Sequence, residues 1–243
     1  MKRLSLLILL FATMSVISAK AQNVQLHYDF GRHAYKSLNS ENKTDARPAL
    51  TSTVEMFRPD KGGSTFFFVD MDYNQGVQGA YWEIARELNF WQNSKMSWLS
   101  AHVEYNGGLN RVASSYDDAF LFGATYSGHS KDFSKTWSIT ASYKIIPRNS
   151  MSMHNFQITG VWGMTFARGY MSFIGFIDFW REYRSWQETS YILLAEPQLW
   201  FNFNAIKGCD KFNLSIGTEV ELSNNFVNKG FYAIPTVAVK WTF

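Results

Sequence analysis

Carboxylate side chains recur at alternate positions along many short segments of the chain, and apolar side chains fill the positions between them. Asp70 and Asp72, for example, alternate with Val69 and Met71. Charged groups placed together on one inner face require water or ion pairs. The acids therefore predict either a hydrated passage that favours neutral or cationic solutes, or a closed interior stiffened by pairing with Lys and Arg. The carboxylates at positions that alternate with the apolar ones are Asp29, Glu55, Asp70, Asp72, Glu83, Glu87, Glu104, Asp178, Glu196, Glu219 and Glu221, with Lys144 and Lys240 as basic partners.

Aromatic side chains are interleaved with the acids on the same faces. Aromatic rings beside carboxylates and amides can stack against a planar base or a sugar and hydrogen-bond its hydroxyl groups. They could equally plug the interior. The aromatic residues on the faces that carry the acids are Phe66, Phe68, Tyr81, Phe176, Trp180 and Trp200. The amide of Gln198 lies on one of the same faces.

One segment could carry nucleophilic chemistry, because Ser150, Ser152, His154 and Asn155 lie close together in the sequence. Some outer-membrane barrels carry enzymatic sites that act on lipid, so an enzyme of this kind is an alternative. Members of a catalytic triad usually come from separate elements, however, and proximity in sequence is weak support. No catalytic residue, metal site or cofactor is predicted, since the five histidines His27, His33, His102, His129 and His154 lack metal-ligand spacing.

The elements that must position these residues are strands, because the apolar pattern has a period of two from end to end. The strand spacing of roughly 18 residues exceeds the 8 to 12 of a compact sandwich and suits strands that cross a bilayer. We expect an all-β transmembrane antiparallel β-barrel of about twelve strands in an up-and-down meander. A soluble exported β-domain that binds a ligand or partner is the alternative. The expected strands are Val24–Phe30, Leu50–Phe57, Thr65–Tyr73, Tyr81–Phe90, Trp98–Asn106, Phe120–Tyr126, Trp137–Ile145, Phe156–Phe166, Met171–Trp180, Tyr191–Asn202, Phe212–Leu222 and Phe231–Phe243.

Two features do not follow the simple alternation. The polar stretch Arg32 to Pro48 has the length of an outer loop, and a further loop is expected from Gly107 to Asp117. Arg86 falls on an apolar face, which is costly at the middle of a bilayer and cheap near its surface. A bulge that shifts the phase of the strand is one explanation.

The N-terminus has the order of a secretory signal peptide: Lys2 and Arg3, an apolar run, then Ala19-Lys20-Ala21. We expect residues 1–21 to be removed and residues 22–243 to form a single domain. All three ionisable side chains of the signal are basic, so 23 Lys+Arg against 20 Asp+Glu become a formally neutral mature chain, with no indication of nucleic-acid binding. Cys209 is the single cysteine, so no internal disulfide is expected.

Composition agrees with a membrane barrel, since aromatic residues make up 17% of the chain and charged residues 18%. Barrel strands need apolar residues at alternate positions, with Trp and Tyr at the two water interfaces. The predicted location is the outer membrane of a Gram-negative bacterium, in contact with the lipid bilayer. An even number of strands places both chain ends on the periplasmic side.

The last strand, Phe231–Phe243, presents an apolar face that ends in Trp241 and Phe243. Its opposite face carries Lys240, which would place a cation among the interior acids. We expect it to pair with Val24–Phe30, because this pairing removes both edges of the sheet.

Several segments together resemble the nucleoside-specific channel-forming (Tsx-like) outer-membrane family. The similarity is strongest over the last third of the chain. The segments are Gly175-Phe176-Ile177-Asp178-Phe179-Trp180, Glu196-Pro197-Gln198-Leu199-Trp200, Gly217-Thr218-Glu219-Val220-Glu221 and Pro235-Thr236-Val237-Ala238-Val239-Lys240-Trp241-Thr242-Phe243.

The resemblance implies a monomeric barrel of about twelve strands with a narrow, aromatic-lined passage for the selective, passive diffusion of nucleosides or similar small polar solutes. It also implies that the outer-membrane barrel-assembly machinery reads the terminal strand through Phe243. The matched positions with inward phase are Phe176, Asp178, Trp180, Glu196, Gln198, Trp200, Glu219 and Glu221.

Overall fold

The computed structural model describes residues 22–35, 38, 47–74, 76–111, 115–184 and 188–243. The expected signal peptide lies outside these residues, as does most of the expected loop from Arg32 to Pro48. Within the described chain, the helices are too short to cross a membrane.

The described residues form strands joined by short connections and three 3-10 helices, η1 (Gly31–Ala34), η3 (Ala167–Gly169) and η4 (Phe203–Ala205). The strands are β1 (Gln22–Asp29), β2 (Leu50–Asp60), β3 (Gly63–Tyr73), β4 (Val77–Leu88), β5 (Leu99–Asn110), β6 (Ala119–His129), β7 (Lys135–Ile145), β8 (His154–Phe166), β9 (Met171–Arg184), β10 (Thr189–Ala195), β11 (Gln198–Asn202), β12 (Leu214–Asn224) and β13 (Phe231–Thr242).

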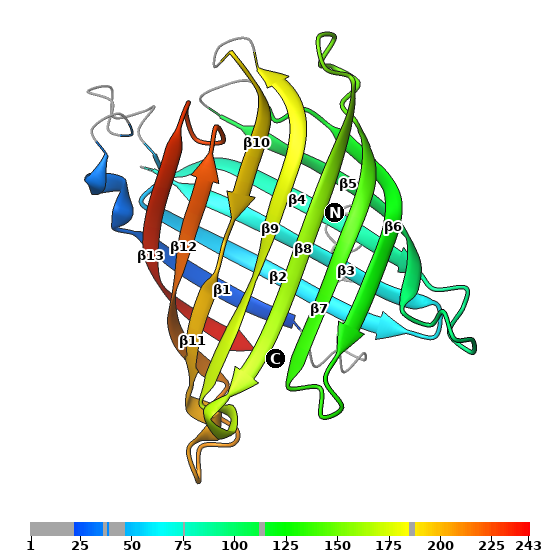
Figure 1. Ribbon diagram of the computed structural model, residues 1–243. Coiled ribbons are helices and arrows are strands. Elements are labelled where there is room, and N and C mark those ends of the chain that lie inside the picture. The colour runs from blue at the N-terminus through cyan, green and yellow to red at the C-terminus, as the bar shows by residue number, and fades with distance from the viewer. Residues whose placement is uncertain (1–21, 36–37, 39–46, 75, 112–114, 185–187) are drawn as a thin grey trace, which may run out of the picture.

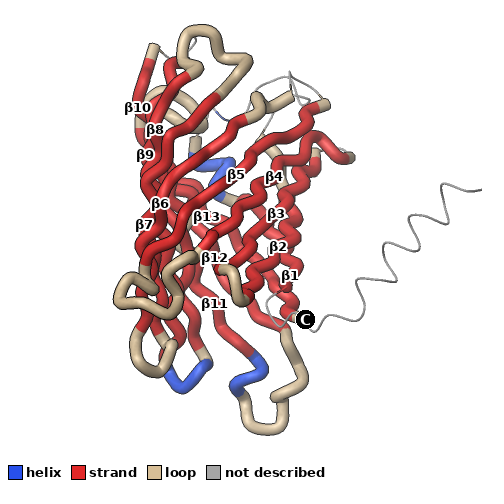
Figure 2. Tube along the Cα trace, turned by 90° about the vertical axis from the view of Figure 1, so that its right-hand side faces the viewer, coloured by secondary structure: helices blue, strands red, loops and turns tan. Residues whose placement is uncertain are grey.

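The strands form one closed antiparallel barrel in which each strand pairs with its neighbours in sequence (Figure 1 and Figure 2). The barrel is closed by the pairing of β1 with β13, in which Val24 lies opposite Trp241 and Tyr28 opposite Val237. The predicted meander and its closing pair are therefore confirmed. Both described chain ends lie at one end of the barrel, where the Phe243 amide donates to the Gln22 carbonyl at 2.9 Å.

Strands β10 and β11 are two parts of one barrel strand, because both lie between β9 and β12. The pairing with β9 keeps its register across the break, with Ala195 opposite Ile177 and Gln198 opposite Ile174. Pro197 causes the interruption, since proline has no amide hydrogen for the ladder. The barrel thus has the predicted twelve strand positions.

Alternation along most strands separates an apolar outer face from a more polar inner face. On β13, Val237 is 53% exposed on the outside, whereas Thr236 is 6% exposed on the inside. On β1, Leu26 and Tyr28 point outward and His27 points inward. A closed sheet with this outer face satisfies its backbone hydrogen bonds internally, which a lipid environment requires.

The interior has small apolar clusters at different places and no continuous hydrophobic core among the described residues. Tyr232 and Ile234 of β13 pack against Leu38, a residue of the connection between β1 and β2. A second cluster contains Leu121 of β6 and Ile146, which follows β7. Polar residues fill much of the space between these clusters.

Arg86 keeps the phase of its strand, lying opposite Thr65 and Val103, so the suggested bulge near it is wrong. Its guanidinium donates to both carboxylate oxygens of Asp60, at 2.5 and 2.9 Å. Asp60 is the last residue of β2, so Arg86 lies at the rim of the barrel, where a charge outside costs little.

Several strand boundaries differ from those expected; for example, β2 continues to Asp60 and β4 begins at Val77. β5 continues to Asn110, so the loop expected from Gly107 begins later, because Gly107 and Gly108 pair with β4. β4 ends at Leu88 and leaves Phe90 in the connection. β9 continues past Trp180 to Arg184. The ends of the barrel strands carry polar residues on both faces, so their alternation is weak there.

Candidate functional site: the polar lumen

The strand register places fifteen of the sixteen predicted site residues on the inner face of the barrel, and Glu196 lies in the break between β10 and β11, where its amide donates to the Phe176 carbonyl. On β3, for instance, Asp70 lies opposite Thr53 of β2 and Tyr81 of β4, and all three point inward. Their role in binding stays a prediction. The sixteen are Phe66, Phe68, Asp70, Asp72, Tyr81, Glu83, Glu104, Phe176, Asp178, Trp180, Glu196, Gln198, Trp200, Glu219, Glu221 and Lys240.

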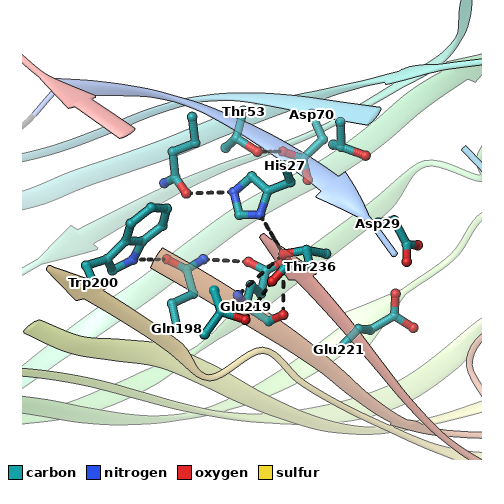
Figure 3. A network of polar contacts seen from close by, with 12 residues as sticks. His27, Asp29, Thr53, Asp70, Gln198, Trp200, Glu219, Glu221 and Thr236 are labelled. Atoms are coloured by element: carbon teal, nitrogen blue, oxygen red, sulfur yellow. Dashed lines mark hydrogen bonds and ion pairs between the residues drawn. The ribbon is translucent and has the colours of Figure 1, made fainter. Parts of the chain in front are cut away.

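A network of hydrogen bonds joins β1, β11, β12 and β13 inside the barrel (Figure 3). The Trp200 indole donates to Gln198 at 2.9 Å, and the Gln198 amide donates to Glu219 at 2.6 Å. His27 lies over this group, with its Nδ1 atom 3.2 Å from the Thr236 hydroxyl and 3.7 Å from Glu219. The polar side chains on this wall are therefore held in fixed positions.

Lysine side chains cover the two inner tryptophans. Lys240 Nζ lies 4.1 Å from the centroid of the Trp200 ring, and Lys144 Nζ lies 4.9 Å from that of Trp180. Trp200 is fully buried and Trp180 is 5% exposed. A cation–π contact therefore occupies one face of each ring, and a stacking role for Trp180 and Trp200 stays a prediction.

A row of four aromatic rings lies along the opposite wall. The centroid of Phe68 is 6.0 Å from those of both Phe66 and Tyr81, and Tyr81 is 5.4 Å from Tyr116. Phe66, Phe68 and Tyr81 are only half-buried. These rings, which we call the aromatic row, remain available for contact with a solute.

Arg47 reaches into the lumen from the connection between β1 and β2. Its guanidinium donates to Asp29 at 2.5 Å and to Glu221 at 2.6 Å. Burial alone would lower the pKa of Arg47, but the charges of Glu221 and Asp29 outweigh it and raise that pKa. The hydroxyl of Tyr35, from the same connection, accepts a hydrogen bond from the Ala233 amide. The described part of this loop thus folds against the inner wall of one mouth.

Carboxylates from nearly opposite walls face each other across the lumen. Asp178 of β9 interacts electrostatically with Glu83 of β4 and Glu104 of β5. Strands β4 and β9 lie on nearly opposite sides of the barrel in the strand order. Lys144 lies within electrostatic range of these acids and donates a hydrogen bond to Gln157 at 2.8 Å.

His102 lies between two carboxylates on the same wall. Its Nδ1 atom is 2.6 Å from Glu87 and its Nε2 atom is 3.1 Å from Glu104. The Thr125 hydroxyl also donates to Glu87, at 2.9 Å. The side chain of His102 is 6% exposed, so this group holds the carboxylates in place inside the barrel wall.

Sequence reasoning missed several residues of the lumen. Glu182 and Arg184 were missed because they lie beyond the expected end of their strand, and Arg47 because it comes from a loop. His27 and His102 were considered only as metal ligands. The alternation along β1 and β5 could have identified them, because it places both side chains on the inner face, where every polar residue is a candidate neighbour of the acids.

Carboxylates outnumber the lysines and arginines that reach the described part of the lumen. Arg47 pairs with both Asp29 and Glu221, one positive charge against two negative ones, and Arg184 pairs with Glu182 at 3.3 Å. No ion pair within the described chain involves Asp70, Asp72 or Glu196. The lumen is therefore polar and negatively charged.

The suggested nucleophile cluster does not assemble. His154 lies on the outer face, where its Nδ1 atom is 2.6 Å from the Tyr143 hydroxyl. Ser152 and Asn155 bond to each other, at 2.6 Å, and are buried on the inner side. No grouping of His, Cys, Asp and Glu suited to a metal ion occurs in the part of the chain that the structure describes.

Among solved structures, the chain is similar to the porin NanC, with a TM-score of 0.56, 9% sequence identity, and coverage of 92% of this chain and 99% of that one. LpxR from Salmonella typhimurium gives a TM-score of 0.44 at 7% identity, covering 92% of this chain and 100% of that one. OpdQ from Pseudomonas aeruginosa gives a TM-score of 0.42 at 9% identity, covering 81% of this chain and 56% of that one. At these identities the NanC match shows the porin-like fold alone, and the two lower scores support no argument.

No curated protein matches the sequence. A family model described as a domain of unknown function, DUF5020, matches residues 21–243.

Proposed function

The chain belongs to the DUF5020 family, and we propose that it is an outer-membrane channel through which small polar solutes, nucleosides among them, diffuse passively. The observation that carries this proposal is the charged and polar interior of a closed barrel whose outer face is apolar. A charged interior is stable when it contains water, and a hydrated barrel connects the two sides of a membrane. The porin-like fold agrees with this function.

The aromatic row supports selectivity for solutes with a flat, apolar face. Phe66, Phe68 and Tyr81 lie beside Asp70 and Glu83 on the same inner wall. A nucleoside presents a planar base for stacking and ribose hydroxyls that donate to carboxylates. The resemblance to the Tsx-like family is consistent with this solute class, and nucleoside selectivity remains part of the proposal.

Single-channel recording in planar bilayers tests the channel and its selectivity separately. We expect steady conductance in KCl that adenosine reduces, because a solute that stacks in the lumen obstructs ion flow. Phe68→Ala should weaken the effect of adenosine. Phe67→Ala is the matched control, since Phe67 is the next residue of β3 and points outward. No conductance under any condition would overturn the channel, and conductance that adenosine leaves unchanged would leave only a general pore.

The location and assembly of the barrel form the second part of the proposal. We place it in the bacterial outer membrane as a monomer that the barrel-assembly machinery recognises through the β13 strand and Phe243. Cell fractionation should recover the protein with outer membranes, with heat-dependent gel migration typical of a folded barrel. Release with soluble periplasmic contents would contradict this location.

A further inference from the structure

Three buried oxygen atoms near the acids of β4 and β5 accept no hydrogen bond. They are Oε1 of Glu104, Oδ1 of Asn106 and Oε2 of Glu87. Asn106 is 3% exposed, and the side chain of Glu104 is 10% exposed. A buried acceptor without a donor is costly, so such atoms indicate a partner that the protein itself does not supply.

The strand register places two of these acceptors, on Glu104 and Asn106, beside Glu83 on one stretch of the inner wall. Asn106 lies directly opposite Glu83, and Glu104 lies opposite Ala85, whose small side chain takes up little of the space between them. Side chains opposite each other on one face of a sheet have Cβ atoms about 4.5–5.5 Å apart. Two carboxylates and an amide oxygen therefore converge within the reach of one small ligand group.

The surrounding charges leave this stretch of wall negative. Asp178 adds a carboxylate from β9, and Lys144 of β7 interacts electrostatically with the group. The ammonium of Lys144 is held away by Gln157 and lies over the Trp180 ring. His102 lies 3.1 Å from Glu104 on the same wall, so Lys144 and a protonated His102 supply two positive charges against the four carboxylates Glu83, Glu87, Glu104 and Asp178. The site therefore favours a further positive charge.

We propose that Glu83, Glu104 and Asn106 bind the ammonium group of a small organic cation during its passage through the lumen. This inference rests on the proposed channel function and assigns a solute class to it. An ammonium group offers three donors and no acceptor, which matches the unpaired oxygen atoms of Glu104 and Asn106 beside the Glu83 carboxylate. Tyr81 donates to Glu83 at 2.7 Å and places its ring beside this carboxylate, where it can contact the alkyl part of the cation.

Isothermal titration of the folded barrel in detergent tests the site with putrescine as the probe. 1,4-Butanediol is the control ligand, because it has the same carbon chain with hydroxyl groups in place of the ammonium groups. We expect putrescine to bind at least about tenfold more tightly than the diol, since charge-assisted hydrogen bonds are the stronger kind.

Two variants at the site distinguish a loss of putrescine binding from a failure of the barrel to fold. Glu104→Gln and Asn106→Leu should each weaken putrescine binding by about tenfold or more, because each removes an acceptor for the ammonium group. Asp210→Asn is the matched control, since Asp210 loses the same charge in an exposed connection between β11 and β12. Heat-dependent gel migration confirms that each variant folds. Asn106→Leu alters no ion pair and remains informative if Glu104→Gln fails to fold.

The outcomes distinguish the site from the channel. Equal binding of putrescine and the diol, or unchanged putrescine binding in both variants, would overturn the ammonium site even if the barrel conducts ions. Putrescine binding that the two variants abolish would support the site even if bilayer recordings show no conductance, a result that would overturn the channel alone.

Discussion

The ion pairs of Arg47 provide the sharpest test of how the lumen is held together. Arg47→Met removes a guanidinium that donates to Asp29 at 2.5 Å and to Glu221 at 2.6 Å. The side chains of both acids are 9% exposed and that of Arg47 is 23% exposed, so all three are largely shielded from water. The substitution leaves two carboxylates without their cation inside the barrel.

The expected loss in the free energy of unfolding is about 3–5 kcal/mol, the usual cost of removing one partner from a buried ion pair. Arg47→Lys should fall between the wild type and Arg47→Met, because lysine keeps the charge but cannot donate to both acids through a planar fork. Reversible unfolding in urea with lipid vesicles, followed by tryptophan fluorescence, measures the change. The channel offers a second measurement, since cation selectivity should rise when the lumen loses a positive charge.

Two further variants separate charge from packing in this prediction. A triple variant that combines Arg47→Met with Asp29→Asn and Glu221→Gln should recover most of the lost stability, because no isolated buried charge remains. Arg86→Met should change stability much less, since its ion pair with Asp60 is exposed to water at the rim. The reasoning is refuted if Arg47→Met unfolds within about 1 kcal/mol of the wild type, or if the triple variant is no more stable than the single one.

Two other predictions concern the barrel wall and one of its turns. Gly175→Ala should lower the free energy of unfolding by about 1–3 kcal/mol, because an added Cβ atom would meet the Glu196 carbonyl oxygen at 2.5 Å and the Trp162 ring at 2.8 Å. Gly160→Ala is the control, since the nearest atom to its Cβ would belong to the movable Ile177 side chain, at 3.1 Å, and equal losses in the two variants would contradict this account. In the connection between β6 and β7, hydrogen bonds from Ser130 and Ser134 lower the pKa of Asp132 to about 2 from its ordinary 3.8. Because the folded pKa is the lower one, the turn should keep this stabilisation above about pH 4 and lose it as the pH falls toward 2, and an NMR titration of Ser130→Ala should show a raised Asp132 pKa.

The fold could be predicted from the sequence because a barrel strand has a strong local signal. Each side chain of β7, for example, faces lipid or lumen in strict turn, so the pattern from Trp137 to Ile145 fixes both the strand and the face of Lys144. The same alternation places Glu83 and Asp178 inside without any knowledge of their neighbours. Strand ends were less predictable, since β9 continues through the charged residues Glu182 and Arg184.

The arrangement within the lumen could not be predicted, because it depends on contacts between residues far apart in sequence. The cation over Trp200 comes from Lys240, and the cation between Asp29 and Glu221 comes from a loop that shows no periodic pattern. Alternation indicates which way a side chain points. It does not indicate how far the side chain reaches or which partner it meets across the barrel.

The pairing of β1 with β13 has a consequence for the order in which the barrel forms. When β10 and β11 are counted as one barrel strand, every other pairing in the described chain joins strands that follow each other in sequence. Only this one joins residues as distant as Asn23 and Thr242. Closing a long loop is entropically unfavourable and slow, so closure should be the last step of folding. A circular permutant that links Phe243 to Gln22 and opens the chain between β4 and β5 should form the same barrel, with this seam made early as an ordinary hairpin.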